Sequence, residues 1–103
     1  MLNQWILISD HMEQEIKQIK LVDAQKMKSK YPETFWTPSD SELSDIKIGD
    51  IVKVCDDHER FWVIIESISN KEFIGVVDNS LLRDDIRCGD YIKFERRHIY
   101  DIN

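Results

Sequence analysis

The fold of this chain is decided by a ten-residue motif that occurs twice, as IKIGDIVKVC at residues 46–55 and as IRCGDYIKFE at residues 86–95. Each copy of this Gly-Asp motif has an isoleucine, a cation, one further residue and Gly-Asp, and then an alternating run with lysine at the same place. Glycine tolerates a positive φ angle in a tight turn, and aspartate can hydrogen-bond the backbone amides of that turn. The repeat therefore predicts two matching turns that lead into β-strands, and a structural role explains it without a ligand.

Around the two motifs, the alternation of apolar and polar residues predicts strands separated by short polar turns. The first two strands flank residues 56–59 and form a hairpin. Gly75 lies inside the third strand, where it predicts a bulge or a sharp bend of the kind that closes small barrels. The five predicted strands are residues 50–55, 60–67, 72–77, 91–95 and 98–102.

The first third of the chain is predicted to be a helical arm. Residues 5–9 form a short strand or an extended lead-in, and Ser9-Asp10 offers an N-cap for a helix over residues 11–30. Asp23 could cap a second helix, so a break near residues 21–23 remains open. Five apolar residues share one face at the helical period: Met12, Ile16, Ile19, Val22 and Met27.

Two local signals bound the helical segments. Tyr31-Pro32 ends the arm, because the residue before a proline avoids the helical region. Ser39 and Glu42 have the spacing of a capping box, which predicts one helical turn at residues 40–44. The predicted fold is therefore α+β, with an N-terminal helix followed by a small five-stranded antiparallel, SH3-like barrel or strongly bent sheet. Residues 1–103 form a single domain, with a helical arm at 1–33 and a barrel-like body at 34–103.

Composition narrows the class of protein. The chain has 103 residues, of which 42% are hydrophobic and 33% charged, and this is typical of one globular domain. No apolar run approaches the roughly 20 residues that cross a bilayer, so we expect a cytoplasmic protein with two reduced, partly buried cysteines. The net charge of −6 argues against nucleic acid as a partner and suits a protein partner with a basic surface.

A metal site or a thiol enzyme would have to use two cysteines and two histidines, Cys55, His58, Cys88 and His98. Cys-x2-His is an acceptable half of a zinc site, whereas Cys-x9-His is not a recognised clip. No third orienting group accompanies a cysteine nucleophile, and the chain has no glycine-rich phosphate loop. Buried thiols with exposed histidines are the simpler interpretation, so the sequence predicts neither catalysis nor a cofactor.

Exposed tryptophans beside acidic turns are the best candidates for a binding surface. Phe35 and Phe61 are predicted to point inward, which leaves the neighbouring tryptophans partly exposed, where they could anchor a partner. Packing of both tryptophans at the end of a barrel is the alternative. The candidate partner-binding residues are Trp36, Asp57, Trp62, Asp84 and Asp85.

Several motifs together resemble a family of small bacterial domains of unknown function. They are Gly49-Asp50-x-Val52-Lys53, Arg60-Phe61-Trp62-Val63, Gly75-x-Val77-x-Asn79 and Gly89-Asp90-x-Ile92-x-Phe94. The resemblance covers residues 34–102 and implies a bacterial or phage origin and a compact barrel. It implies no catalytic or ligand residue, and Asn79-Ser80 departs from the Asn-Pro of such domains.

The function predicted on these grounds is that of a non-catalytic protein-interaction module with an acidic, tryptophan-bearing surface. An immunity or inhibitor protein that masks a basic site on a toxin or effector is the narrower alternative. A Cys/His-dependent enzyme or metal protein is the alternative from another class.

Overall fold

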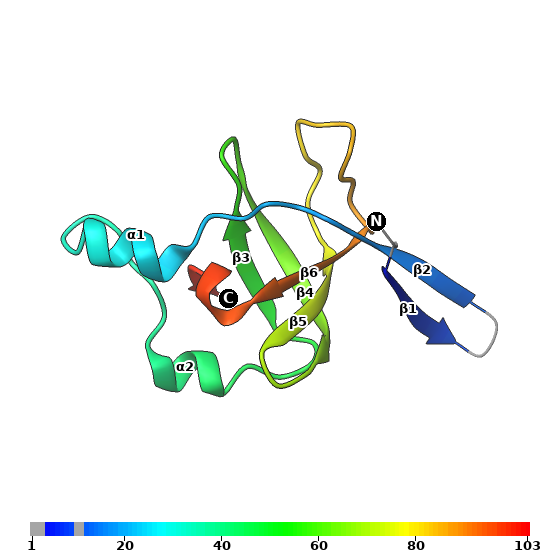
Figure 1. The fold of residues 1–103 in the computed structure, drawn as a ribbon, viewed down its shortest axis with the longest axis horizontal. Helices are drawn as coiled ribbons and strands as arrows, with labels where there is room; N and C mark the ends of the chain where they lie inside the picture. The colour runs from blue at the N-terminus through cyan, green and yellow to red at the C-terminus, as the bar shows by residue number, and fades with distance from the viewer. Residues whose placement is uncertain (1–3, 10–11) are drawn as a thin grey trace.

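The structure is a computed structural model, and it describes residues 4–9 and 12–103. In these residues two helices and seven strands form an α+β fold, with all strands in one sheet of order β1-β2-β6-β5-β4-β3-β7 (Figure 1). The predicted α+β class is confirmed. The elements are β1 Gln4–Ser9, β2 Met12–Lys17, α1 Ala24–Lys30, α2 Asp40–Ser44, β3 Ile51–Cys55, β4 Arg60–Ile68, β5 Glu72–Val77, β6 Tyr91–Glu95, the 3-10 turn η1 Arg96–His98 and β7 Asp101–Ile102.

The sheet is mixed and open, which corrects the prediction of a five-stranded antiparallel barrel. β2 runs parallel to β6, with Ile16 opposite Tyr91, while the other neighbouring strands are antiparallel. Among the described residues the sheet has two edge strands, β1 and β7, so it is not closed. The additional strands come from the N-terminal segment. The predicted closing strand at residues 98–102 shortens to β7, because His98 belongs to η1 and residues 99–100 are in no regular element.

The strand predicted at residues 5–9 is confirmed as β1, but of the helix predicted over residues 11–30 only α1 at Ala24–Lys30 forms, because Met12–Lys17 is the strand β2. β1 and β2 pair antiparallel, with Trp5 opposite Glu15 and Leu7 opposite Glu13. Met12 and Ile16 fit a strand face as well as a helix face, because a spacing of four residues matches both periods. Pairing with the apolar β1 decides between them, since tertiary context overrides local propensity. The predicted cap at Asp10 lies outside the described residues.

The helical signals further along the chain are confirmed. Asp23 is the N-cap of α1, and its carboxylate accepts a hydrogen bond from the Lys26 backbone N–H at 3.0 Å. Tyr31 is the C-cap, next to the proline that was expected to end the helix. Ser39 and Glu42 form the predicted reciprocal capping box at the start of α2.

The two Gly-Asp motifs form the same turn. Gly49 and Gly89 have φ angles of 96° and 94°, in the region that favours glycine. The Asp50 carboxylate accepts from the Lys47 N–H at 2.9 Å, and the Asp90 carboxylate accepts from the Arg87 N–H at 2.8 Å. Each glycine N–H donates to a strand of the sheet, the first to Ile65 of β4 and the second to Val77 of β5. The predicted structural role of the repeat is confirmed.

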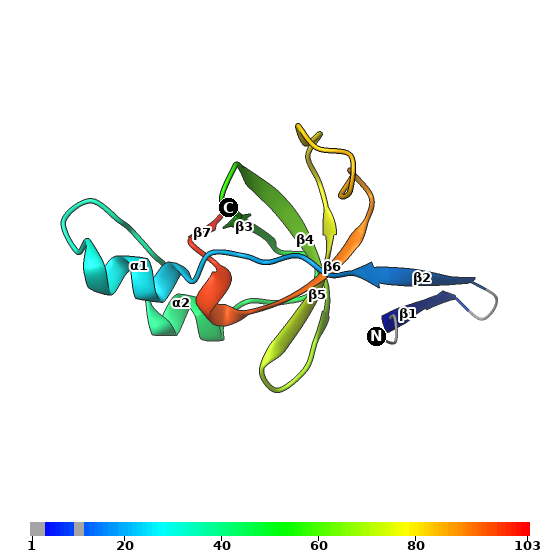
Figure 2. The same cartoon turned by 45° about the horizontal axis from the view of Figure 1, so that its top comes forward.

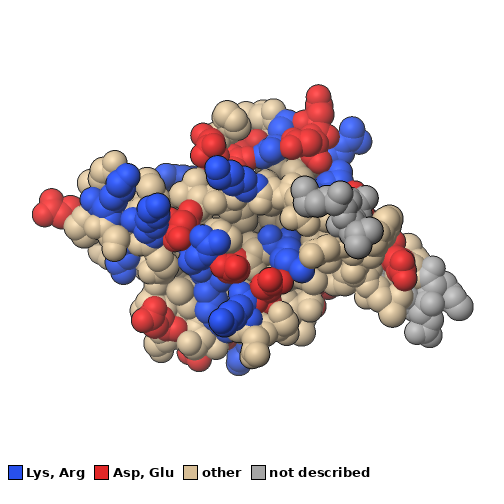
Figure 3. All heavy atoms as spheres, in the orientation of Figure 1, with Lys and Arg blue, Asp and Glu red and all other residues tan. Residues whose placement is uncertain are grey.

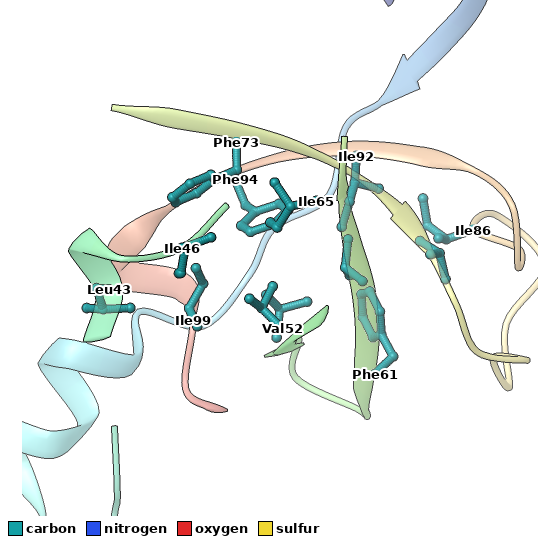
Figure 4. Close-up of a cluster of buried hydrophobic side chains, with 13 residues drawn as sticks. Leu43, Ile46, Val52, Phe61, Ile65, Phe73, Ile86, Ile92, Phe94 and Ile99 are labelled. Atoms are coloured by element: carbon teal, nitrogen blue, oxygen red, sulfur yellow. The ribbon is translucent and has the colours of Figure 1, made fainter. Parts of the chain in front are cut away.

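The core lies on the inner face of β3, β4, β5 and β6 and continues to α2 and the segment after η1 (Figure 4). Position 75 in this core accommodates only glycine, because a Cβ atom there would lie 2.2 Å from a methyl group of Val63. The irregularity expected near Gly75 falls in the opposite strand, where the β4–β5 register shifts between Ile65 and Ser67. The core consists of Leu43, Ile46, Val52, Val54, Phe61, Val63, Ile65, Phe73, Val77, Ile86, Ile92, Phe94 and Ile99.

The helices and the N-terminal hairpin lie at opposite ends of the molecule (Figures 1 and 2). Between them, residues 18–23 cross the body as an extended segment, and the Val22 N–H donates to the Cys55 carbonyl at 2.8 Å. Ile19 and Leu21 of this segment pack against the core. The crossing segment therefore covers the body, while the hairpin projects beyond it.

Candidate interaction surface

Trp36 lies in the connector between the two helices, at the edge of a cavity of about 360 Å³. Its side chain is 81% exposed, which confirms the expected exposure. Phe35 beside it is half-buried and contacts Tyr100, with 5.9 Å between the ring centroids. We call this cavity the Trp36 pocket; it is lined by Thr34, Phe35, Trp36, Thr37, Pro38, Glu42, Arg60, Tyr100, Asp101 and Ile102.

The floor of the Trp36 pocket continues into a stack of aromatic rings and cations on the outer face of β3 and β4. The Arg60 guanidinium carbon lies 5.0 Å from the centre of the Tyr100 ring. Lys53 Nζ lies 4.9 Å from the Trp62 ring and 5.8 Å from the Tyr100 ring. Such contacts hold a cation and a ring together where both are partly exposed. The half-buried Trp62 is therefore linked to the Trp36 pocket through Lys53 and Tyr100.

Two hydroxyl groups at the Trp36 pocket are buried without a hydrogen-bond partner among the described residues, Thr37 Oγ1 and the Tyr100 hydroxyl. Burial raises the pKa of Tyr100, and the neighbouring Arg60 offsets part of that rise. The phenol therefore keeps its proton near neutral pH and can donate a hydrogen bond. Both hydroxyl oxygens are almost fully covered, so the polar contacts that the pocket offers come from its exposed side chains, Arg60 among them.

The acidic candidates lie on two loops, the β3–β4 turn at residues 56–59 and the β5–β6 loop at residues 78–90. Arg83 joins the loops: its guanidinium contacts the Asp56 carboxylate and makes two hydrogen bonds to Asp85, at 2.6 and 2.7 Å. The Glu59 carboxylate accepts from the Leu82 N–H at 3.2 Å across the same gap. The two loops are therefore braced against each other, and we call them the acidic loop pair.

The bracing divides the acidic candidates into two kinds. The Arg83 guanidinium lowers the pKa of Asp85 to about 2, so this carboxylate already has a cationic partner. Asp57 and Asp84 are exposed, and no ion pair is found for either within the described part of the chain. Figure 3 shows acidic side chains at the tips of the loops at the top of the view, among a few basic ones. Of the three predicted acidic residues, Asp57 and Asp84 are therefore the ones without a cationic partner among the described residues.

The predicted residues thus fall into two neighbouring groups. Trp36 and Trp62 are linked by the stack of rings and cations, whereas Asp57, Asp84 and Asp85 belong to the acidic loop pair. Asn79, at the base of the β5–β6 loop, accepts a hydrogen bond from the Trp62 N–H at 2.5 Å and so ties the loop pair to β4. The surface around the tryptophans carries charges of both signs, because Arg60 and Lys53 contact the rings while Glu42 and Asp101 line the Trp36 pocket, whereas the sequence predicted an acidic surface.

Sequence reasoning gave no binding role to Arg60, Lys53 or Tyr100. A signal for Lys53 existed, because the predicted hairpin with its turn at residues 56–59 places this lysine opposite Trp62, and the structure has that register. For Tyr100 no local signal existed. Its place depends on the path of β7 along β3, which the sequence alone does not specify.

The cysteines and histidines lie in unlike surroundings. Cys55 is buried, and burial raises the pKa of its thiol, whereas Cys88 is exposed, contrary to the expected buried thiol. His98 accepts a hydrogen bond from the Glu95 N–H through Nδ1, at 3.0 Å. In the residues that the structure describes, no three His, Cys, Asp or Glu side chains are arranged to hold a metal ion.

Comparisons with protein-family models, with curated proteins and with solved structures found no match for this chain. The resemblance to small bacterial domains therefore stays a prediction. None of the helices described is long and apolar enough to cross a membrane.

Proposed function

We propose that this chain is a non-catalytic protein-interaction module, with the Trp36 pocket as its main contact surface. The observation that carries the proposal is the 81% exposure of Trp36 at the edge of an aromatic cavity. A tryptophan offers a large apolar area with few rotatable bonds, and for this reason it often anchors protein interfaces. Trp36 is not needed to fill the core of β3 to β6, because other side chains fill it.

The charges around the pocket indicate the chemistry of the partner. Glu42 and Asp101 line the pocket, and Asp57 and Asp84 extend the negative charge on the acidic loop pair. Arg60 is exposed in the lining and supplies donors for backbone carbonyl groups of a bound segment. The partner we propose is a cytoplasmic protein that inserts an apolar side chain beside Trp36 and brings basic residues next to it.

Selection from a library of displayed random peptides tests this proposal. Wild-type protein is the only target of the selection, and the affinity of each selected peptide is then measured for wild type and for the variants. We expect the selected peptides to combine an apolar residue with lysine or arginine, and their affinity to fall at least about tenfold for Trp36→Ala and Arg60→Ala. Ile48→Ala is the matched control, because Ile48 is 66% exposed but does not line the pocket. Peptides that bind wild type and Trp36→Ala equally would refute the proposal.

The acidic loop pair supports a second candidate function, an immunity or inhibitor protein that masks a basic site. Its specific support is the contact of Arg83 with both loops, which holds Asp57 and Asp84 on a braced surface. Charges on such a surface raise the association rate with a basic partner. Affinity capture with three baits separates the candidates. A protein retained by wild type and Trp36→Ala but lost with the Asp57→Asn/Asp84→Asn double variant favours inhibition, and a protein lost only with Trp36→Ala argues against it.

A further inference from the structure

β1 has an open edge. One side of this strand pairs with β2, and within the described residues no strand pairs with the other side. The backbone N–H and C=O groups on an open edge form a template for another strand. This edge lies at the far end of the molecule from the helices, so the body of the molecule does not cover it (Figures 1 and 2).

The sequence of β1 lacks the features that normally protect an edge strand. β1 reads QWILIS, with no charged residue and no proline. Natural edge strands avoid pairing by means of lysine, proline, inward-pointing charges or bulges. The one irregularity of β1 lies between Leu7 and Ser9, which leaves residues 4–7 in regular register.

Apolar side chains accompany this open edge. Trp5 and Leu7 are 57% and 64% exposed, and they lie on one face of the hairpin because side chains two residues apart in a strand point to the same side. Their partners on β2 are Glu15 and Glu13. A two-stranded hairpin alone has marginal stability in water. The hairpin is held to the body through the end of β2. Ile16 and Lys17 pair with β6, and Lys17 Nζ lies 3.0 Å from the Asp90 carboxylate. A further strand on the edge would stabilise the hairpin.

We propose that the open edge of β1 pairs with β1 of a second copy of this chain. The two strands run antiparallel about a two-fold axis at Ile6, so that Ile6 faces its own counterpart and Trp5 of each copy lies opposite Leu7 of the other. This register keeps each face of the hairpin continuous across the two copies, and it forms the Trp–Leu pair twice, as a two-fold interface does.

β1 is uncharged and pairs with itself in this two-fold register, so charge does not oppose a second copy as the occupant of the edge. β1 carries no charge, so identical strands meet without repulsion at the junction. Glu13 and Glu15 lie on β2, one strand further out. In the order β2-β1-β1-β2 the two β2 strands are separated by three inter-strand distances, about 14 Å in total. This separation exceeds the Debye length of about 8 Å at physiological salt. The acidic charge of the hairpin therefore does not oppose the pairing.

Sedimentation velocity of the full chain over a concentration series tests the pairing. Wild type is expected to dimerise, and Trp5→Lys or Leu7→Glu to raise the dissociation constant about tenfold or more. A mixture of the two variants should recover a dimer, because Lys at position 5 then lies opposite Glu at position 7. Met12→Lys is the control, since Met12 is 56% exposed but lies on β2. A wild-type monomer up to the solubility limit, or a dimer that Trp5→Lys leaves intact, overturns the proposal.

Cross-linking tests the register of the pairing. In a Cys88→Ser background, Ile6→Cys is expected to form a covalent dimer on mild oxidation, because the two residues face each other. Gln4→Cys should not, since its counterpart is offset by four residues, about 13 Å along the strands. Equal cross-linking of both variants contradicts the register. An unchanged melting temperature for all variants shows that the body remains folded.

Discussion

The body of the sheet and the N-terminal hairpin follow the same alternation of side chains with opposite results. In β4, Phe61, Val63 and Ile65 are fully buried. In β1, Trp5 and Leu7 alternate in the same way and remain more than half exposed. The difference arises because β4 has a strand on each side and a core beneath it, whereas β1 has one neighbouring strand among the described residues. An apolar alternation thus predicts a strand, while its neighbours determine whether the strand belongs to the core or to an interface.

The largest effect should come from filling the space at Gly75 in the body. A Cβ atom there would lie 2.2 Å from Val63 Cγ1 and 2.9 Å from the Ile64 carbonyl oxygen, so Gly75→Ala forces the strands apart. We expect the free energy of unfolding in urea to fall by about 3 kcal/mol. Gly89→Ala is the matched control: nothing lies within 4 Å, so only its positive φ angle opposes alanine, at about 1–2 kcal/mol. Equal losses at the two glycines would contradict the packing in the body.

The two Gly-Asp turns should differ in their effect on the hairpin. Asp50→Ala and Asp90→Ala each remove one turn hydrogen bond, and we expect each to lower the free energy of unfolding by about 1 kcal/mol. Only Asp90 also contacts Lys17, so Asp90→Ala alone should speed amide exchange in β2. If Asp50→Ala speeds that exchange as much, the Lys17–Asp90 contact is not what holds the hairpin to the body.

A smaller change in stability is expected when the pH is varied, because His98 in η1 titrates. Burial, followed by the nearby Arg97, lowers the pKa of His98 from its ordinary value of about 6.5. The unfolded chain then binds a proton at higher pH than the folded one, so the free energy of unfolding falls as pH drops below about 6.5 and levels off at the lowered pKa. Urea unfolding on either side of that pH measures the slope. His98→Gln should flatten this slope, and an unchanged slope in that variant would assign the pH dependence to other groups.

The smallest effect on stability is expected at Trp36. Since its side chain is 81% exposed, Trp36→Ala should change the free energy of unfolding by no more than about 0.5 kcal/mol. Phe61→Ala, in the core, should lower it by about 3–5 kcal/mol. A large loss of stability for Trp36→Ala would assign this tryptophan to packing and would remove the main support for the Trp36 pocket as a binding site.

The sequence predicted local structure better than the arrangement of distant segments. The caps at Asp23 and Ser39, the two Gly-Asp turns and strands β3 to β6 follow from residues that are near one another in the chain. The hairpin was mistaken for a helix because the spacing of Met12 and Ile16 fits both periods. The Trp36 pocket was not predicted beyond Trp36, because it joins the connector between the helices to β4 and β7. Such contacts depend on tertiary packing, which a single sequence does not specify.

Hydrogen–deuterium exchange at two protein concentrations is the most direct test of the contrast between body and hairpin. Amides of β1 should become more protected as the concentration rises, because the second copy covers their edge, while those of β3 to β6 should be equally protected at both concentrations. If β1 is as protected as the body at the lower concentration, the hairpin needs no partner. If protection of β3 to β6 also rises with concentration, the body is not stable on its own, and the contrast is wrong.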